Sequence, residues 1–136
     1  MTCSFQVLGK PVGKGRPRFS TVNGYVRPYT PTKTVEFENL VRIAWMNAGF
    51  EKMDGMLSVG IDAYFPIPTS YSKKKQAALE GADYDKKPDV DNICKSVLDA
   101  LNGIAYDDDK QVVSVVIRKM YSATPRTDIV IAQKGD

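Results

Sequence analysis

Residues 87–121, KPDVDNICKSVLDALNGIAYDDDKQVVSVVIRKMY, decide the fold class, because a helical pattern is followed by a polar loop and an apolar strand. The helix is expected over residues 92–101, and Gly103 ends it. Its inward-facing residues are Ile93, Val97, Leu98 and Leu101. Residues 112–121 are apolar on both faces, which predicts a central strand of a sheet. A buried strand beside an amphipathic helix predicts an α/β domain.

The rest of the chain supplies further strands and helices to the same domain. Strands are expected at residues 4–8, 57–65 and 128–132, the last one peripheral, and a hairpin at 19–22 and 25–27 around Asn23-Gly24. Helices are expected from Thr30-Pro31 to Gly49, with the Thr30 hydroxyl as cap, and from Ser72 to Leu79. The longer one is expected to bury Phe37, Leu40, Val41, Ala44, Trp45 and Ala48. The pattern predicts one compact domain over residues 1–136, with a mixed sheet and packed helices.

Composition excludes several classes of protein. The 136-residue chain has no histidine, which excludes Ser–His and Cys–His hydrolases and histidine-ligated zinc enzymes. Cys3 and Cys94 are too few for a zinc site and are expected to be reduced. No apolar run approaches the roughly 18–20 residues that cross a bilayer, and the N-terminus has no signal-peptide pattern. We therefore expect a cytoplasmic protein without a membrane partner.

The net charge of +3 hides two segments of opposite sign. Residues 1–35 carry six cations and no acid, whereas residues 83–109 carry eight aspartates. This asymmetry indicates a polyanion that one segment holds and the other processes; the alternative is that both segments are solvated loops. The cations expected to contact DNA are Lys10, Lys14, Arg16, Arg18 and Arg27, with Lys73 and Lys74 from the short helix.

The acidic segment has the composition of a site for a hard metal ion. Asp89 and Asp91 follow Pro88 in an expected extended stretch, where residues i and i+2 project to the same side. A third carboxylate is expected from the run Asp107–Asp109. Carboxylates without histidine suit Mg²⁺, with Mn²⁺ as a substitute, and such an ion orients water for attack on a phosphodiester. The structural alternative is that Asp91 is a helix cap and that the second run is a polar turn.

Lys95 lies one helical turn after Asp91, so the two side chains are expected on the same face. A lysine beside a carboxylate–metal site stabilises negative charge that develops on a phosphate. Asp99 is expected to orient Lys95 or to cap locally rather than to bind metal.

Three motifs together resemble the RusA-type Holliday junction resolvases. They are KPDVDNICK (87–95), LDALNG (98–103) and YDDDKQV (106–112), and the opening residues GKP (9–11) and KGRPR (14–18) resemble that family too. The resemblance covers nearly the whole chain with matched order and spacing. It implies a homodimeric α/β endonuclease of DNA recombination and repair, often phage- or prophage-encoded, that cuts four-way junctions with magnesium.

The resemblance also assigns roles to particular residues. Asp89, Asp91 and Lys95 take catalytic roles, and the remaining acid of the family stands just before x-Gln-Val, which is Asp109 here, with Asp108 as second choice. We expect each protomer of the homodimer to supply a complete set of these residues. Two other functions remain open: a nuclease of flaps or forks, and a junction-binding protein whose acids are structural.

Overall fold

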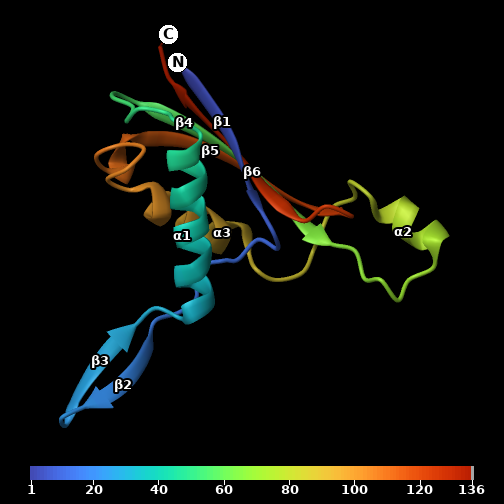
Figure 1. The fold of residues 1–136 in the computed structure, drawn as a ribbon, viewed down its shortest axis with the longest axis horizontal. Helices are drawn as coiled ribbons and strands as arrows, with labels where there is room; N and C mark the ends of the chain where they lie inside the picture. Colours follow the sequence, from blue (N-terminus) through green and yellow to red (C-terminus); the bar gives the residue numbers. More distant parts are fainter. Residues whose placement is uncertain (136) are drawn as a thin grey trace.

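The computed structural model describes residues 1–135, which form a four-stranded mixed sheet, two helices against it, a separate hairpin and a short outlying helix (Figure 1). The strands are β1 (Thr2–Leu8), β2 (Arg18–Val22), β3 (Tyr25–Tyr29), β4 (Leu57–Pro66), β5 (Val112–Ser122) and β6 (Arg126–Gln133). The helices are α1 (Thr32–Asn47), α2 (Lys73–Leu79) and α3 (Val90–Leu101), with a 3₁₀ turn at Asp109–Gln111. The structure confirms the expected α/β class and the mixed sheet. The helices and strands also follow one another along the chain in the expected order.

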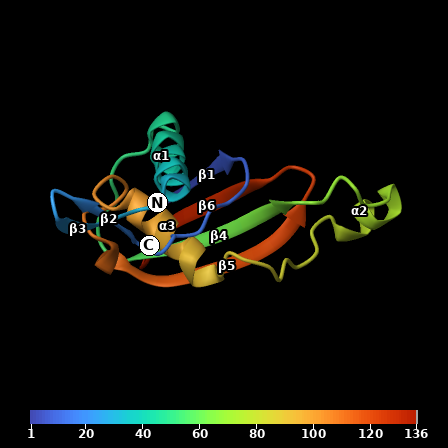
Figure 2. The same cartoon turned by 90° about the horizontal axis from the view of Figure 1, so that it is seen from below.

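The strand order of the sheet is β1-β6-β4-β5, with β4 and β5 parallel and the other pairs antiparallel (Figure 2). The expected places of the last two strands were therefore wrong: β6 is internal and β5 is at the edge. Val113 and Val116 of β5 are exposed, so the apolar pattern of this strand does not report a neighbour on each side. Strand β6 is internal because β1, from the opposite end of the chain, pairs with its outer side.

Helices α1 and α3 cover one face of the sheet, and the core lies between them and the strands. Trp45 of α1 is buried, and its ring lies 5.7 Å from the ring of Phe5 on β1 and 5.3 Å from that of Phe50. Burial of such aromatic groups from both layers supplies much of the force that holds a helix on a sheet. Three details of the expected α1 were wrong. Leu40 is exposed, Ala48 is an exposed C-cap just past the last helical residue, and no side chain caps the start of the helix, whose N-cap is Pro31.

The β2–β3 hairpin projects from the body below α1, and α2 lies on an extended segment beyond the other end of the sheet (Figure 1). Asn23 and Gly24 have φ of 52° and 80°, which fits the tight turn that this pair favours. The Ser72 hydroxyl accepts a hydrogen bond from the Lys75 amide, which confirms Ser72 as the cap of α2. The expected hairpin and short helix are thus both present.

Candidate active site

The start of α3 presents two carboxylates with different backbone conformations. Asp89 is the N-cap residue, with an extended backbone, and Asp91 lies in the first helical turn. The expectation of an extended pair was wrong, because the helix begins at Val90. No hydrogen bond or ion pair within residues 1–135 holds the side chains of Asp89, Asp91 or Lys95. Both carboxylates are therefore available to an external cation.

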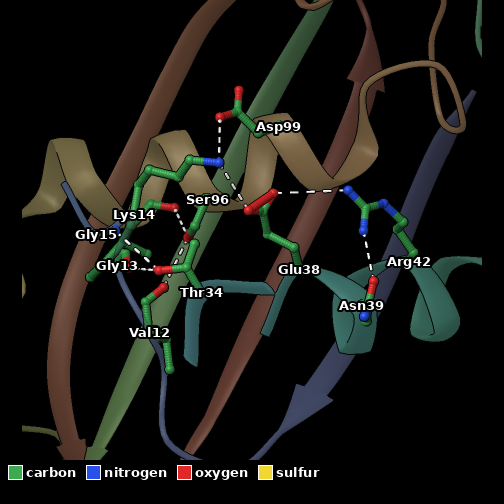
Figure 3. Close-up of polar contacts among 11 residues, drawn as sticks. Val12, Gly13, Lys14, Gly15, Thr34, Glu38, Asn39, Arg42, Ser96 and Asp99 are labelled. Atoms are coloured by element: carbon green, nitrogen blue, oxygen red, sulfur yellow. Dashed lines mark hydrogen bonds and ion pairs between the residues drawn. The ribbon is translucent and has the colours of Figure 1, made fainter. Parts of the chain in front are cut away.

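Residues 10–18, here called the basic loop, lie across the N-terminal half of α3 (Figure 3). The Lys14 amide donates to the Asn92 carbonyl at 2.7 Å, and the Ser96 hydroxyl donates to the Val12 carbonyl at 2.9 Å. Gly13 lies so close to the turn before α3 that a Cβ atom there would be 2.6 Å from the Pro88 Cβ. The loop is therefore fixed directly against the segment that carries Asp89.

The basic loop and the start of α3 enclose a cleft of about 660 Å³. Its charged lining consists of Lys10, Lys14, Arg16, Lys33, Lys87 and Asp89. Apart from Lys14, these cations have no acidic partner among the described residues. The unpaired cations would bind the phosphates of a nucleic acid and so hold a phosphodiester next to the free carboxylate of Asp89. The two segments of opposite charge, distant in sequence, thus meet at one site.

Lys14 differs from its neighbours because its partly buried ammonium group lies between two carboxylates (Figure 3). Its Nζ lies 2.9 Å from Glu38 of α1 and 3.2 Å from Asp99 of α3. Burial alone would lower the pKa of Lys14, but the hydrogen bonds and charges of the two carboxylates outweigh it, and the pKa is raised. Asp99 therefore does not orient Lys95, as expected, but joins α3 to the basic loop. A phosphate contact by Lys14 stays a prediction.

On the other side of Asp89, Lys119 of β5 fixes the turn before α3. Its Nζ donates to the Lys86 carbonyl at 2.6 Å and to the Pro88 carbonyl at 3.0 Å. The ring of Tyr84 stacks on that of Phe65, with centroids 4.1 Å apart, and anchors the same segment to the core. Sequence analysis did not single out Lys119, because nothing in a strand pattern shows which carbonyls a side chain will reach.

Replacing Lys119 by methionine is expected to loosen the Asp89 turn, because two hydrogen bonds from a charged donor are lost, at about 1–3 kcal/mol. Urea denaturation measures the free energy of unfolding. It should fall by this full amount in Lys119→Met and by less in Lys119→Arg, because arginine keeps a hydrogen-bond donor. Lys134→Met, an exposed control outside the site, should have no effect. Equal stability of Lys119→Met and the unaltered protein would mean that these hydrogen bonds do not hold the turn.

The second acidic segment, Asp107–Asp109, lies at the opposite end of α3. The Asp109 amide donates to the Asn102 side chain at 2.9 Å, directly after the last turn of the helix. The 12 residues of α3 separate this point from Asp89 by about 18 Å, at a rise of 1.5 Å per residue. Among residues 1–135, no three acidic or cysteine side chains are close enough to hold one metal ion. The expectation that one chain gathers all the carboxylates around a metal was therefore wrong.

Within this second segment the three acids have different environments. Asp107 forms an ion pair with Lys52 at 2.9 Å. The hydrogen bond from the Lys110 amide lowers the pKa of Asp108, which caps the 3₁₀ turn. Partial desolvation, followed by the hydrogen bond and the charge of Asp108, raises the pKa of Asp109. Among the three acids of this segment, Asp109 is thus the one whose ionised form a nearby cation would stabilise most.

The chemistry of the donors at the start of α3 fits magnesium. Mg²⁺ in proteins is commonly held by one or two carboxylates, with waters and substrate phosphates as its other ligands. Asp89, which lines the cleft, and Asp91, in the first turn of α3, are two carboxylates whose side chains form no hydrogen bond or ion pair within residues 1–135. They would hold the ion, and a phosphate in the cleft would complete its ligands.

The close approach of Gly13 to Pro88 gives a direct test of how the loop is held. Gly13→Ala is expected to destabilise the protein by roughly 1–3 kcal/mol, because overpacking forces the loop or the turn to shift. Gly60→Ala on β4 is the matched control, because its added Cβ would meet its nearest neighbour, the Val130 Cβ, only at 4.0 Å. Thermal unfolding compares the two, and similar melting temperatures would show that the loop is not tightly packed.

The remaining expected DNA contacts lie away from the cleft. Arg18 and Arg27 stand on the hairpin, and Lys73 and Lys74 on α2. The structure adds Lys33 and Lys87 to the cleft, two residues not selected from sequence. Two features of the sequence could have indicated them. Lys33 belongs to the basic segment of residues 1–35, and Lys87 directly precedes Pro88-Asp89.

Unpaired cations gathered in one cleft are typical of proteins that bind nucleic acids. Residues 9–132 match the endodeoxyribonuclease RusA family, and the chain belongs to that family. It is also 40% identical over 139 residues to the uncharacterized protein YqaN of Bacillus subtilis (strain 168), with 98% of each chain covered. The family indicated by the sequence motifs is therefore confirmed. In the described part of the chain, no helix has the length and apolar character needed to span a membrane.

Proposed function

We propose that the protein is a magnesium-dependent endonuclease that, as a homodimer, resolves four-way DNA junctions by paired nicks during recombination or repair. The observation that carries this proposal is the cleft of about 660 Å³ in which unpaired cations surround Asp89. Membership of the endodeoxyribonuclease RusA family supports the nuclease chemistry.

The charged residues of the cleft, and Asp91 and Lys95 of the adjoining helix α3, each have a role that follows from charge and position. Asp89 and Asp91 hold the ion, which when bound acts as a Lewis acid and lowers the pKa of water. Lys95 stabilises negative charge on the phosphate during strand cleavage. Lys10, Arg16, Lys33 and Lys87 hold the backbone phosphates on either side, which keeps the reacting phosphate next to Asp89.

The proposal is tested by nicking of a synthetic four-way junction with a fixed branch point. Paired nicks with Mg²⁺ or Mn²⁺, none with a chelator, and little cutting of linear duplex are expected. Faster cutting of a flap or a fork than of the junction would assign a different branched substrate. Tight binding to the junction without cutting under every metal condition would make the protein a binding module.

The basic loop and hairpin are expected to set the salt dependence of binding. If Arg16 and Arg18 each contact one phosphate, replacing both by alanine lowers the slope of log affinity against log salt by about 1.8, at roughly 0.9 per contact. Because phosphate contacts carry no sequence information, the affinity should fall equally for junctions of different sequence. Binding titrations at several salt concentrations measure the slope, with exposed Lys134→Ala as control. An unchanged slope would place both arginines outside the DNA interface.

A further inference from the structure

We propose that one face of the β2–β3 hairpin binds unpaired bases at the branch point of the DNA. This face, here called the arginine–tyrosine face, consists of Arg18, Tyr25, Arg27 and Tyr29. The inference rests on the proposed function for the identity of the DNA, but the contacts that carry it belong to the hairpin alone.

The strand register places these four side chains on the same side of the hairpin. Arg18 pairs with Tyr29 and Ser20 pairs with Arg27, and directly paired residues share a face. Because side chains alternate along a strand, Tyr25, Arg27 and Tyr29 also project together. The opposite side carries the pairs Phe19–Pro28 and Thr21–Val26, which have no charge.

Both tyrosines are accessible to a ligand. Tyr25 is 71% exposed and Tyr29 is 48% exposed. Four residues at about 3.3 Å each place them roughly 13 Å apart along the strand, with Arg27 between them. This spacing lets each ring stack on its own base while the arginine holds the intervening phosphate.

The arginine–tyrosine face continues into the cleft that holds Asp89. Arg18, Tyr29 and Lys33 line one hollow, and Lys33 also lines the cleft. No acid occurs in residues 1–35, so the whole path is complementary to a DNA strand and opposed to an acidic protein surface. A strand leaving the cleft therefore meets the hairpin next.

Unpaired bases fit this surface better than duplex does. In a duplex the faces of the bases are stacked on one another, so exposed tyrosine rings find no partner there. At a branch point the stacking is interrupted, and aromatic side chains bind such bases regardless of their sequence. The arginine–tyrosine face would thus distinguish branched DNA from linear DNA.

The experiment compares two double variants without metal, so that cleavage does not interfere. Tyr25→Ala/Tyr29→Ala alters the arginine–tyrosine face, and Phe19→Ala/Val26→Ala alters the opposite face, also at exposed positions. Affinities are measured for a single-stranded oligonucleotide, a junction with unpaired nucleotides at its centre, and a linear duplex. Sedimentation of each variant reports its oligomeric state.

The tyrosine variant is expected to bind the oligonucleotide and the junction about tenfold more weakly or worse, with duplex affinity and salt slope unchanged, since stacking releases no counterions. The control variant should bind all three as the unaltered protein does. Equal losses on duplex, loss in the control variant alone, or a change of oligomeric state would overturn the inference. Because binding to a single strand is measured without cutting, this result is independent of whether the protein nicks junctions.

Discussion

Replacing Asp91 by asparagine is expected to abolish cleavage while junction affinity stays the same or increases. The amide keeps the shape of the side chain but removes a negative charge that would hold the ion. Loss of such an electrostatic contribution lowers the rate by at least about 10²–10³-fold. Since the carboxylate of Asp91 has no partner within residues 1–135, its removal leaves no buried charge behind. Removing one negative charge near the phosphates favours binding.

The measurement compares the nicking rate, the binding affinity and the circular dichroism spectrum of Asp91→Asn. Asp85→Asn serves as the control, because this exposed aspartate precedes the same helix and stands before the motif of residues 87–95 that contains Asp89 and Asp91. Normal cutting by Asp91→Asn would remove this residue from the metal site. Loss of helical signal would assign it a structural role in α3 instead.

Mixing Asp89→Asn protomers with Asp109→Asn protomers is expected to restore nicking that neither variant shows alone. Within one chain the two residues stand near opposite ends of α3, whose 12 residues span about 18 Å. If both serve one ion, as the family motifs imply, Asp109 has to come from the partner protomer. A mixed dimer then holds one site with both native acids and one site with neither, so it nicks a single strand.

Dimers that are refolded together from equal amounts of the two variants provide this test. Half of the dimers are then mixed, and nicked intermediates should accumulate while complete resolution stays rare. A mixture without any activity, when each variant alone is also inactive, would mean that the residues act within one chain. Full activity of Asp109→Asn by itself would remove Asp109 from the chemistry.

Much of the fold was accessible from sequence, because local patterns report which side chains are buried. The Asn23-Gly24 turn, the Ser72 cap and the burial of Trp45 each depend on contacts close by or on strong periodicity. The positions of β5 and β6 were not accessible, because strand order depends on a pairing with β1 more than 100 residues away. Leu40 shows a similar limit: it has helical spacing but faces away from the sheet.

In the candidate site too, local features could be predicted from the sequence and long-range contacts could not. The residue types, the carboxylates and the basic loop were found from composition and motif spacing, and the cleft brings Asp89 to the loop. Sequence reasoning did not foresee that the length of α3 would separate Asp109 from Asp89. It also missed the ion pairs of Lys14 with Glu38 and Asp99, because these join three segments that are distant along the chain.

The contact between Gly13 and Pro88 would link DNA binding to catalysis if the basic loop holds DNA and Asp89 holds the metal ion, as proposed. Because there is no room for even one methyl group between them, the loop that carries the cations would be expected to move together with the turn that carries Asp89. Any shift of the loop during junction binding would carry Asp89 with it, so alignment of the reacting groups would accompany binding without a separate closing motion.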